Sequence, residues 1–430
     1  MRHHLLIFLL VFFSCSAFGQ KKAKPKLLVY GQGEAAFAAA IQASASGVST
    51  LWVVPEAALR TGLEQAGAGG EGAWKSATGK GLWSEFLRAS QNATELNDSV
   101  LNRAASLLNP QLARTTLAKM VDSSKNLQVR YDSGIRKVKK SGKRWKITLN
   151  DGSSHKVYAA VDASTTPVLL PLVQASDRAG DTAKGASGFI ALDSLYNSVL
   201  YKTSLAVVER EGKWMVPSSS LIRPQAKNIF SVYTDGALNA AYAGQVPEAF
   251  IMGQVFGATA AYCAFFETES DKINIRTLQG ELLAFKVELI PFSDISFEDR
   301  HYQAIQRLGM TGILQGHIDS AELVFDTDSH VSSEEIRPVI ESLYTRSQIW
   351  FRDKSIEELS LADLLDLIKF IALKGNELNS EVERGWQSRF NFTGEYDPGC
   401  LVSRRQVAVL LDHYLKPFQV KVQKDGSFRY

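Results

Sequence analysis

The chain has 430 residues, of which 45% are hydrophobic and 22% charged, a composition that fits a globular protein and excludes a disordered one. Its length suffices for one large domain and a smaller one. The formal net charge of +3 gives no reason to expect a nucleic acid as partner.

The first residues, MRHHLLIFLLVFFSCSAFGQ, predict a secretory signal peptide over residues 1–19. The apolar run Leu5–Phe13 follows a positive charge and is too short to span a bilayer. Ala17 and Gly19 are the small residues that signal peptidase reads, so we expect cleavage after Gly19 and a periplasmic or secreted protein. Cys15 leaves a lipoprotein as the less favoured alternative, because bulky Phe13 makes a poor lipobox. No later apolar run predicts a transmembrane helix.

The mature chain begins with a strand, a glycine turn, a helix and a second strand. Leu27–Tyr30 is an apolar run typical of a buried strand. The alanine-rich segment Glu34–Ser46 has no helix breaker, so it predicts a helix that Gly47 closes. Thr50–Val54 is the second predicted strand, and Thr61–Gly81 is rich in glycine and alanine and predicts a long loop.

Two helices and a group of short strands follow. The helices are predicted at Leu82–Ala89 and Gln111–Val121, the second after Asn109 and Pro110. Leu127–Val161 alternates in the manner of an antiparallel meander inserted into an α/β domain. The meander carries a basic cluster of Lys137, Lys139, Lys140, Lys143, Arg144 and Lys146. The cluster is either an anion site or, as we prefer, the solvated face of a hairpin.

The next elements alternate between strands and one long helix. Leu205–Arg210 and Lys213–Val216 predict a hairpin, and Asn228–Tyr233 predicts another short strand. Ile251–Glu267 is strongly apolar and predicts a buried helix. From Pro291 onward the chain is helical and more polar, which predicts a C-terminal module.

The C-terminal module contains a faint repeat. Val331–Tyr344 and Val402–Leu415 each begin with Val-Ser, in which the serine is a predicted N-cap, and continue as an amphipathic helix. The segment FSDISFEDRHYQAIQRLGMTGILQG, residues Phe292–Gly316, resembles an S-layer-homology repeat. That resemblance implies a module for docking to the cell surface or to a protein, or for packing between domains, and not a catalytic one.

The stretch Gly31-Gln32-Gly33-Glu34-Ala35-Ala36 fits the pattern G-x-G-x-x-[GA] between a predicted strand and a predicted helix. Gly31 permits the tight turn, Gly33 permits the close approach of a pyrophosphate, and Ala36 keeps the helix near the sheet. Free N–H groups and the helix dipole then favour a phosphate at the start of the helix.

The chain here resembles bacterial FAD-dependent oxidoreductases with a glutathione-reductase-like FAD domain, over roughly residues 26–265. The segments that carry the resemblance, besides the glycine turn and its alanine-rich helix, are GKGLWSEFLR (Gly79–Arg88), VYAAVDAS (Val157–Ser164), PSSSLIRPQAKNIFSVYTD (Pro217–Asp235) and MGQVFGATAAY (Met252–Tyr262). The implied fold class is α/β: a Rossmann-like domain at residues 20–280 with a parallel sheet, an inserted meander at about 127–161 and a reduced substrate region at about 165–220. A mostly helical module at 290–430 would follow.

The resemblance also implies cofactor contacts. Gly31, Gly33 and Ala36 would hold the FAD pyrophosphate. The remaining implied contacts are Asp162 and Ser164 on the adenine–ribityl side, Asp235 at the ribityl or pyrophosphate group, and Gly253 with Gln254 at the start of the last helix, facing the flavin O2 edge.

One departure from the family concerns the ribose. The acid that ends the second strand in the family is Val54 here, and the nearest acid is Glu56. A shift of two residues keeps the same side of an extended chain, so Glu56 is the expected replacement.

Three functional hypotheses remain at this stage. The first is a secreted or periplasmic FAD-dependent oxidoreductase that moves a hydride between an unknown organic substrate and the flavin. The second is a catalytically degenerate scaffold that acts in binding or assembly, and the third is an NAD or nucleotide-sugar enzyme. The sequence names no catalytic base, and its histidines show no metal-binding spacing. Cys263 and Cys400 do not define a disulfide framework, and Cys263 is expected to be buried.

Overall fold

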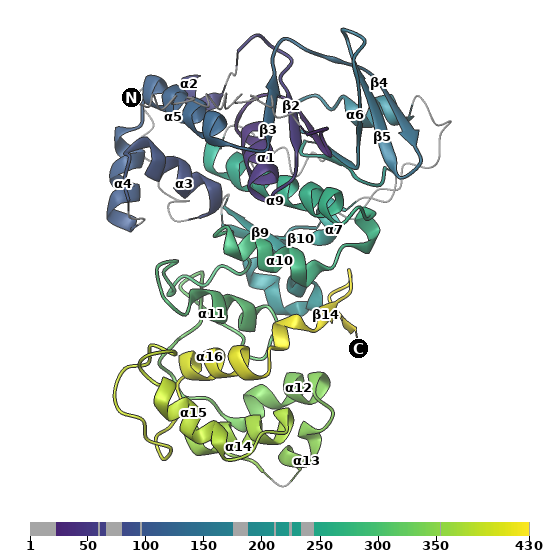
Figure 1. Cartoon of the computed structure of the whole chain (residues 1–430). Helices are drawn as coiled ribbons and strands as arrows, with labels where there is room; N and C mark the ends of the chain where they lie inside the picture. The colour runs from purple at the N-terminus through teal and green to yellow at the C-terminus, as the bar shows by residue number, and fades with distance from the viewer. Residues whose placement is uncertain are drawn as a thin grey trace, which may run out of the picture.

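The structure is a computed structural model that describes residues 23–58, 61–65, 80–94, 97–174, 188–209, 212–222, 226–233, 245–352 and 354–429. The predicted signal peptide and Asp235 lie outside these ranges. The strands of the N-terminal part lie at the top of Figure 1 and the C-terminal helices at the bottom, while the C-terminus returns to the middle.

The N-terminal part is built on a parallel sheet in the order β11-β7-β1-β2-β3. The strands are β1 (Leu27–Tyr30), β2 (Thr50–Val53), β3 (Leu127–Arg130), β7 (Ala159–Asp162) and β11 (Ile229–Ser231). The earliest strand, β1, lies in the centre, with Leu27 opposite Thr50 on one side and Ala159 on the other. The predicted positions of β1 and β2 are confirmed, as is the α/β fold class.

Each face of the sheet is covered by a different layer. Leu27 and Val29 belong to the core that contains α1 (Glu34–Ala45) and α9 (Val246–Phe265). Leu28 and Tyr30 belong to a second core under a small antiparallel sheet. The alternation follows from the period of a strand, and both faces are buried, as is usual for parallel sheets.

The meander is shorter than predicted. It contains β4 (Ile135–Ser141), β5 (Arg144–Leu149) and β6 (Ser154–Val157), which pair antiparallel in that order. The flanking segments, predicted as its outer strands, are β3 and β7 of the parallel sheet instead. Alternation shows that a strand forms but not which neighbour it takes, which explains the error.

Six further helices within the described ranges belong to the N-terminal part. They are α2 (Gly62–Gln65), α3 (Gly81–Ser90), α4 (Asp98–Leu107), α5 (Pro110–Ser123), α6 (Leu169–Gln174) and α7 (Ser218–Leu221). The predictions that became α3 and α5 are confirmed. The expected loop at Thr61–Gly81 contains a helix, α2, that the sequence did not predict, and residues 66–79 of this loop lie outside the described ranges. The helix α4 was not predicted either.

A second sheet leads from the parallel sheet to the C-terminal helices. It has the order β8-β10-β9 and consists of β8 (Ile190–Ala191), β9 (Ser204–Glu209) and β10 (Lys213–Pro217). The 3₁₀ helices η1 (Leu192–Asn197) and η2 (Val199–Thr203) precede β9. The predicted hairpin is therefore confirmed as β9 and β10.

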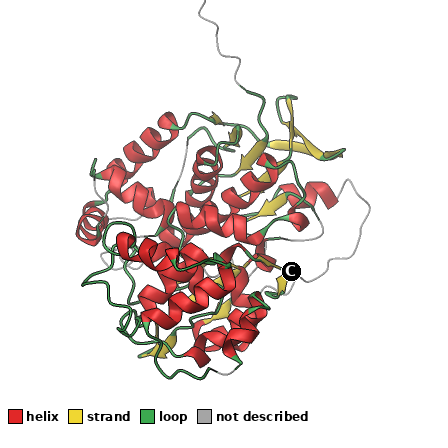
Figure 2. Cartoon of the chain, turned by 60° about the horizontal axis from the view of Figure 1, so that its bottom comes forward, coloured by secondary structure: helices red, strands yellow, loops and turns green. Residues whose placement is uncertain are grey.

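The C-terminal part is mostly helical, as Figure 2 shows. Its elements are η3 (Ser270–Lys272), α10 (Ile275–Ala284), α11 (Tyr302–Gly309), β12 (His317–Asp319), β13 (Glu322–Val324), α12 (Ser333–Leu343), α13 (Ser347–Phe351), α14 (Leu361–Ala372), α15 (Glu377–Gly385), α16 (Arg404–Tyr414), η4 (Pro417–Gln419), β14 (Lys421–Val422) and β15 (Phe428–Arg429). Their buried side chains continue the core of α1 and α9 without a break. The domain boundary near residue 285 stays a prediction.

The two Val-Ser segments of the repeat do cap helices. The Ser332 side chain accepts a hydrogen bond from the Glu335 N–H at the start of α12. Ser403 and Gln406 form a reciprocal capping box at the start of α16. The predicted N-caps are therefore confirmed.

Two further findings concern the described ranges as a whole. None of the helices within them has the length and apolar character that a membrane crossing requires. Cys263 is buried and Cys400 exposed, and both are free thiols.

Candidate functional site

The glycine turn after β1 lies directly against the chain that leaves β7. Gly31 has a φ of +131°, and a Cβ there would stand 2.6 Å from the Ala163 carbonyl carbon and 2.8 Å from the Ser164 nitrogen. Only glycine fits such a contact and such a backbone conformation. The structure therefore brings together two predicted site residues, Gly31 and Ser164, from adjacent strands.

The helix after this turn begins without a side-chain cap. Gly33 is its N-cap residue, with a φ of +84°, and gives the first turn no side-chain cap. Ala36 is fully buried and packs in the core beneath the helix. Uncapped N–H groups and the helix dipole make such a terminus attractive to an anion.

Glu56 lies beside the glycine turn. Its Oε1 accepts a hydrogen bond of 3.1 Å from Gln32 Nε2, although β2 ends at Val53. The other amide atom, Gln32 Oε1, is buried and has no hydrogen-bond partner among the described residues. A buried amide oxygen without a partner is unusual in a native protein, so this one fits a site that a polar ligand completes.

Glu34 is an acid that the sequence analysis did not single out. It stands in the first turn of α1, and its Oε1 accepts a 3.0 Å hydrogen bond from the Leu63 N–H of α2. The pKa of Tyr233, two residues after β11, rises to about 12 because the phenol is buried and lies near the Glu34 carboxylate. A fixed negative charge thus lies at the helix terminus that would hold a phosphate.

The Asp162 carboxylate serves the connection between β7 and α6. It is fully buried, and it accepts hydrogen bonds from the N–H groups of Val168 at 2.6 Å and Leu169 at 2.7 Å, and from both N–H and Oγ of Ser164. Burial raises the pKa of Asp162, and these hydrogen bonds oppose the rise. The backbone after Asp162 reaches the glycine turn, while its side chain stabilises a loop.

Gly253 and Gly257 pack against α1. The sequence analysis had expected Gly253 at the start of α9, facing the flavin. A Cβ on Gly253 would stand 2.7 Å from Ala35 Cα, and one on Gly257 would stand 2.8 Å from Ala39 Cα. The helix begins at Val246, roughly two turns before Gly253. The predicted position of Gly253 at the helix start is therefore wrong, since a glycine needed for close approach can face another helix as well as a cofactor.

The side-chain amide of Gln254 makes hydrogen bonds within the protein. Its Oε1 accepts a 2.7 Å hydrogen bond from the Leu82 N–H, and its Nε2 donates to Gln42 Oε1 at 2.9 Å and to the Phe285 carbonyl at 3.2 Å. The side chain is almost fully buried. It therefore joins α9 to three other helices and does not lie at the helix start, where the flavin edge was expected.

The packing of the two glycines shows that α1 and α9 run in the same direction. Gly253 meets Ala35 and, one turn later, Gly257 meets Ala39, so both N-termini point to the carboxyl edge of the sheet. The α9 terminus is also without a side-chain cap, and Val246 lies close to Gly62 beside Glu34. Two helix dipoles that point in the same direction repel one another, and negative charge near their N-termini offsets this repulsion.

Glu248 in the first turn of α9 is a further residue that the sequence analysis missed. It is 2% exposed, and its pKa rises to about 7 because the carboxyl is buried, with Glu209 adding to the rise and Lys80 opposing it. Lys80 itself forms a 2.7 Å ion pair with Glu288. The sequence signal was available, since Glu248 is the one acid within an otherwise apolar helix.

In the part of the chain that the structure describes, no group of three or more His, Cys, Asp or Glu side chains is placed to hold a metal ion.

Comparison with known protein families finds a match over the segment that contains the glycine turn. A family model described as FAD dependent oxidoreductase matches residues 26–199. This match supports the FAD-dependent oxidoreductase family, and with it FAD as cofactor. No curated protein matches the chain.

Solved structures align with about a third of the chain. Bacillithiol disulfide reductase from Staphylococcus aureus is 16% identical, with 33% of this chain and 38% of that chain covered and a TM-score of 0.21. Thioredoxin reductase from T. acidophilum is 15% identical, with 33% and 35% covered and a TM-score of 0.19. Tetracycline destructase Tet(51) is 13% identical, with 33% and 38% covered and a TM-score of 0.22. The aligned part thus spans little more than a third of each of these proteins.

Proposed function

Because residues 26–199 match the FAD dependent oxidoreductase model, we propose that the protein binds FAD and moves a hydride between an organic substrate and the flavin. The observation that carries the proposal is the shared orientation of α1 and α9, whose N-termini lie at the same end as the glycine turn and receive no side-chain cap from their N-cap residues. A dinucleotide pyrophosphate supplies the negative charge that this end favours.

The residues around the turn fit the cofactor. The first N–H groups of α1, which follow the N-cap residue Gly33, would hold the pyrophosphate, and Gly31 permits the tight turn against Ala163 that precedes them. Glu56 would accept hydrogen bonds from the ribose hydroxyls, and the buried Gln32 Oε1 would gain the donor that it lacks. When bound, FAD supplies the ring that accepts or donates the hydride.

Glu248 is the described acid with a pKa suited to proton exchange at neutral pH. Its place in the first turn of α9 puts it on the helix whose N-terminus lies near Glu34 and Gly62. It is therefore the first residue to test for a proton-transfer role.

The test is the spectrum of the purified protein. Residues 20–430 would be expressed, loaded with FAD if colourless, and passed through gel filtration. Flavin bands that co-elute with the protein are expected. A folded protein that retains no FAD would contradict the proposal and leave the scaffold hypothesis.

We also propose that the protein is exported to the periplasm or secreted, on the strength of the predicted signal peptide. The mature N-terminus is then expected at Gln20, which mass spectrometry of the protein expressed from residue 1 would detect. A full-length product in the cytoplasm is the contrary result.

We also propose, from the resemblance of residues 292–316 to an S-layer-homology repeat, that the C-terminal helices act in docking. Co-sedimentation of the purified protein with cell-wall preparations would test it. Recovery of the intact protein in the supernatant would count against docking through these helices.

A further inference from the structure

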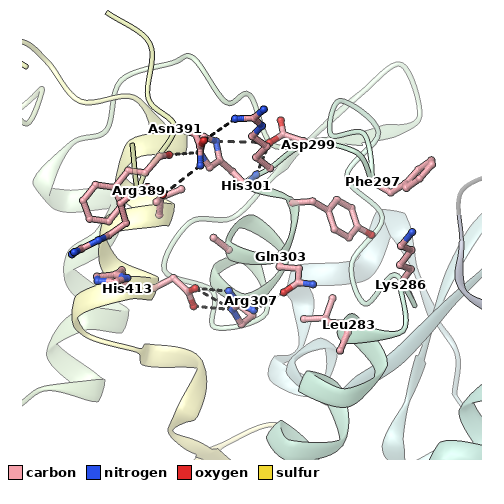
Figure 3. A pocket seen from close by; sticks show the side chains of 17 residues that line it. Leu283, Lys286, Phe297, Asp299, His301, Gln303, Arg307, Arg389, Asn391 and His413 are labelled. Carbon is pink, nitrogen blue, oxygen red and sulfur yellow. Dashed lines mark hydrogen bonds and ion pairs between the residues drawn. The ribbon is translucent and has the colours of Figure 1, made fainter. Parts of the chain in front are cut away.

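Two hollows adjoin one another between α10, α11 and α16. The smaller one measures about 400 Å³ and the larger one about 750 Å³, and Arg307, Asp412 and His413 line both. Figure 3 shows Arg307, Arg389 and His413 among the side chains around the smaller hollow. The larger volume lies within the range typical of sites for small organic ligands.

The wall that the two hollows share is electrically neutral. Arg307 Nε donates to Asp412 Oδ1 at 3.0 Å, and its Nη2 donates to Oδ2 at 2.7 Å. A forked arginine–carboxylate pair of this kind is strong and leaves little net charge. Asp412 is also the only acid lining the described part of the larger hollow, so no other carboxylate there can neutralise a cation.

Arg276 lines the larger hollow as a buried cation without a counter-ion. It is 3% exposed, and its guanidinium donates to neutral acceptors alone: Nη1 to the Lys202 carbonyl at 3.3 Å and Gln279 Oε1 at 2.9 Å, and Nη2 to the Met310 carbonyl at 3.1 Å. Its Nε is buried with no partner among the described residues. Burial lowers the pKa of Arg276 to about 9, as expected for a charge that no carboxylate compensates.

Lys416 adds a second cation at the rim of the same hollow. It is exposed and follows α16 in a left-handed conformation, and no carboxylate pairs with it within the described ranges. Phe418 supplies an apolar surface, with its ring 4.7 Å from the Arg276 guanidinium carbon. Thr277 and Gln419 supply neutral hydrogen-bonding groups.

We propose that the larger hollow is a binding site for a small organic oxyanion, a carboxylate or a phosphate ester, held by the charges of Arg276 and Lys416 beside the ring of Phe418. Arginine and lysine are the side chains that bind both oxyanions, and an uncompensated buried cation gains most from such a partner. The site shares no residue with the glycine turn and does not depend on FAD binding.

Calorimetric titration of the purified chain, residues 20–430, tests the proposal. Inorganic phosphate and malonate are the probes, and chloride holds the ionic strength constant because exposed charges are screened by salt. Saturable one-site binding of at least one probe is expected. Lys416→Gln should weaken it about 10-fold, which corresponds to about 1.4 kcal/mol. Lys369→Gln removes an equal charge from α14, away from both hollows, and should leave the affinity unchanged.

The remaining outcomes separate the two ligand classes and decide the proposal. Binding of phosphate alone assigns the site to phosphate esters, and binding of malonate alone assigns it to carboxylates. Arg276→Met should abolish binding, but that variant also removes contacts to three elements, so Lys416→Gln carries the decision. No saturable binding of either probe, or equal affinities in both lysine variants, overturns the proposal.

Discussion

Gln32 Nε2 donates a hydrogen bond of 3.1 Å to Glu56 Oε1, which joins the turn after β1 to the segment that follows β2. The two residues come from neighbouring strands of the parallel sheet. The contact places a carboxylate beside the glycine turn although the strand itself ends in buried, apolar residues. An acid two positions later than the family pattern therefore still reaches the expected neighbourhood.

Replacing Glu56 with Gln should weaken FAD binding. The carboxylate accepts hydrogen bonds from hydroxyls more strongly than an amide, and hydrogen bonds to charged groups contribute about 1.5–3 kcal/mol. We expect a dissociation constant raised about 10-fold, measured by quenching of flavin fluorescence on titration. Glu357→Gln, an exposed acid in the C-terminal part, is the matched control. Equal affinities in both variants would remove Glu56 from the site.

Replacing Glu34 with Gln should act in the opposite direction. Its carboxylate stands at the helix terminus that would receive a pyrophosphate, so removing the charge should strengthen FAD binding in the same titration. The free energy of unfolding should fall by about 0.3–1 kcal/mol, because the acid also favours the α1 dipole. Weaker FAD binding in Glu34→Gln would show that the phosphate lies elsewhere.

Substituting Gly253 with Ala should destabilise the fold. The added methyl would overlap the backbone of Ala35, and overpacking of this kind costs about 1–3 kcal/mol. Gly280→Ala in α10 is the control, since nothing lies within 4 Å of a Cβ there and alanine favours a helix interior. Urea denaturation should show a loss for the first variant and a slight gain for the second. Equal stabilities would mean that α1 and α9 do not pack this closely.

Glu248 should make the stability depend on pH. Its pKa rises from 4.5 to about 7 on folding, so between these values the folded state binds more protons than the unfolded state. The contribution of Glu248 to stability is therefore fully present below about pH 4.5 and is lost as the pH rises to about 7. Relative to wild type, Glu248→Gln should become more stable as the pH increases through this window, in denaturation series at several pH values. A constant difference would show that Glu248 titrates normally.

The local sequence pattern was sufficient to predict the elements around the glycine turn. The apolar run of β1, the unbroken alanine helix and the strand after Gly47 have strong signals, and the structure places them within one residue of the prediction. The roles of distant residues were harder to predict. Gly253 and Gly257 have the spacing of one helical turn, which fits a helix partner as well as a cofactor, and only the fold shows that Ala35 and Ala39 oppose them.

Other features depended on contacts that no local pattern contains. The two flanking strands of the meander alternate like its own strands, and their partners in the parallel sheet lie far away in sequence. The Gln32–Glu56 contact needed the turn geometry, although the residue spacing along an extended chain pointed to it. The buried charge of Arg276 was invisible in the sequence, because its burial comes from three separate elements.

The central position of β1 fixes when the site can form during synthesis. The glycine turn is synthesised before β2, yet β1 acquires its second neighbour only with β7, and α1 acquires its cover only with α9. A nascent chain that ends before Phe265 leaves the alanine face of α1 open to water. The cofactor turn is therefore incomplete until α9 has been synthesised.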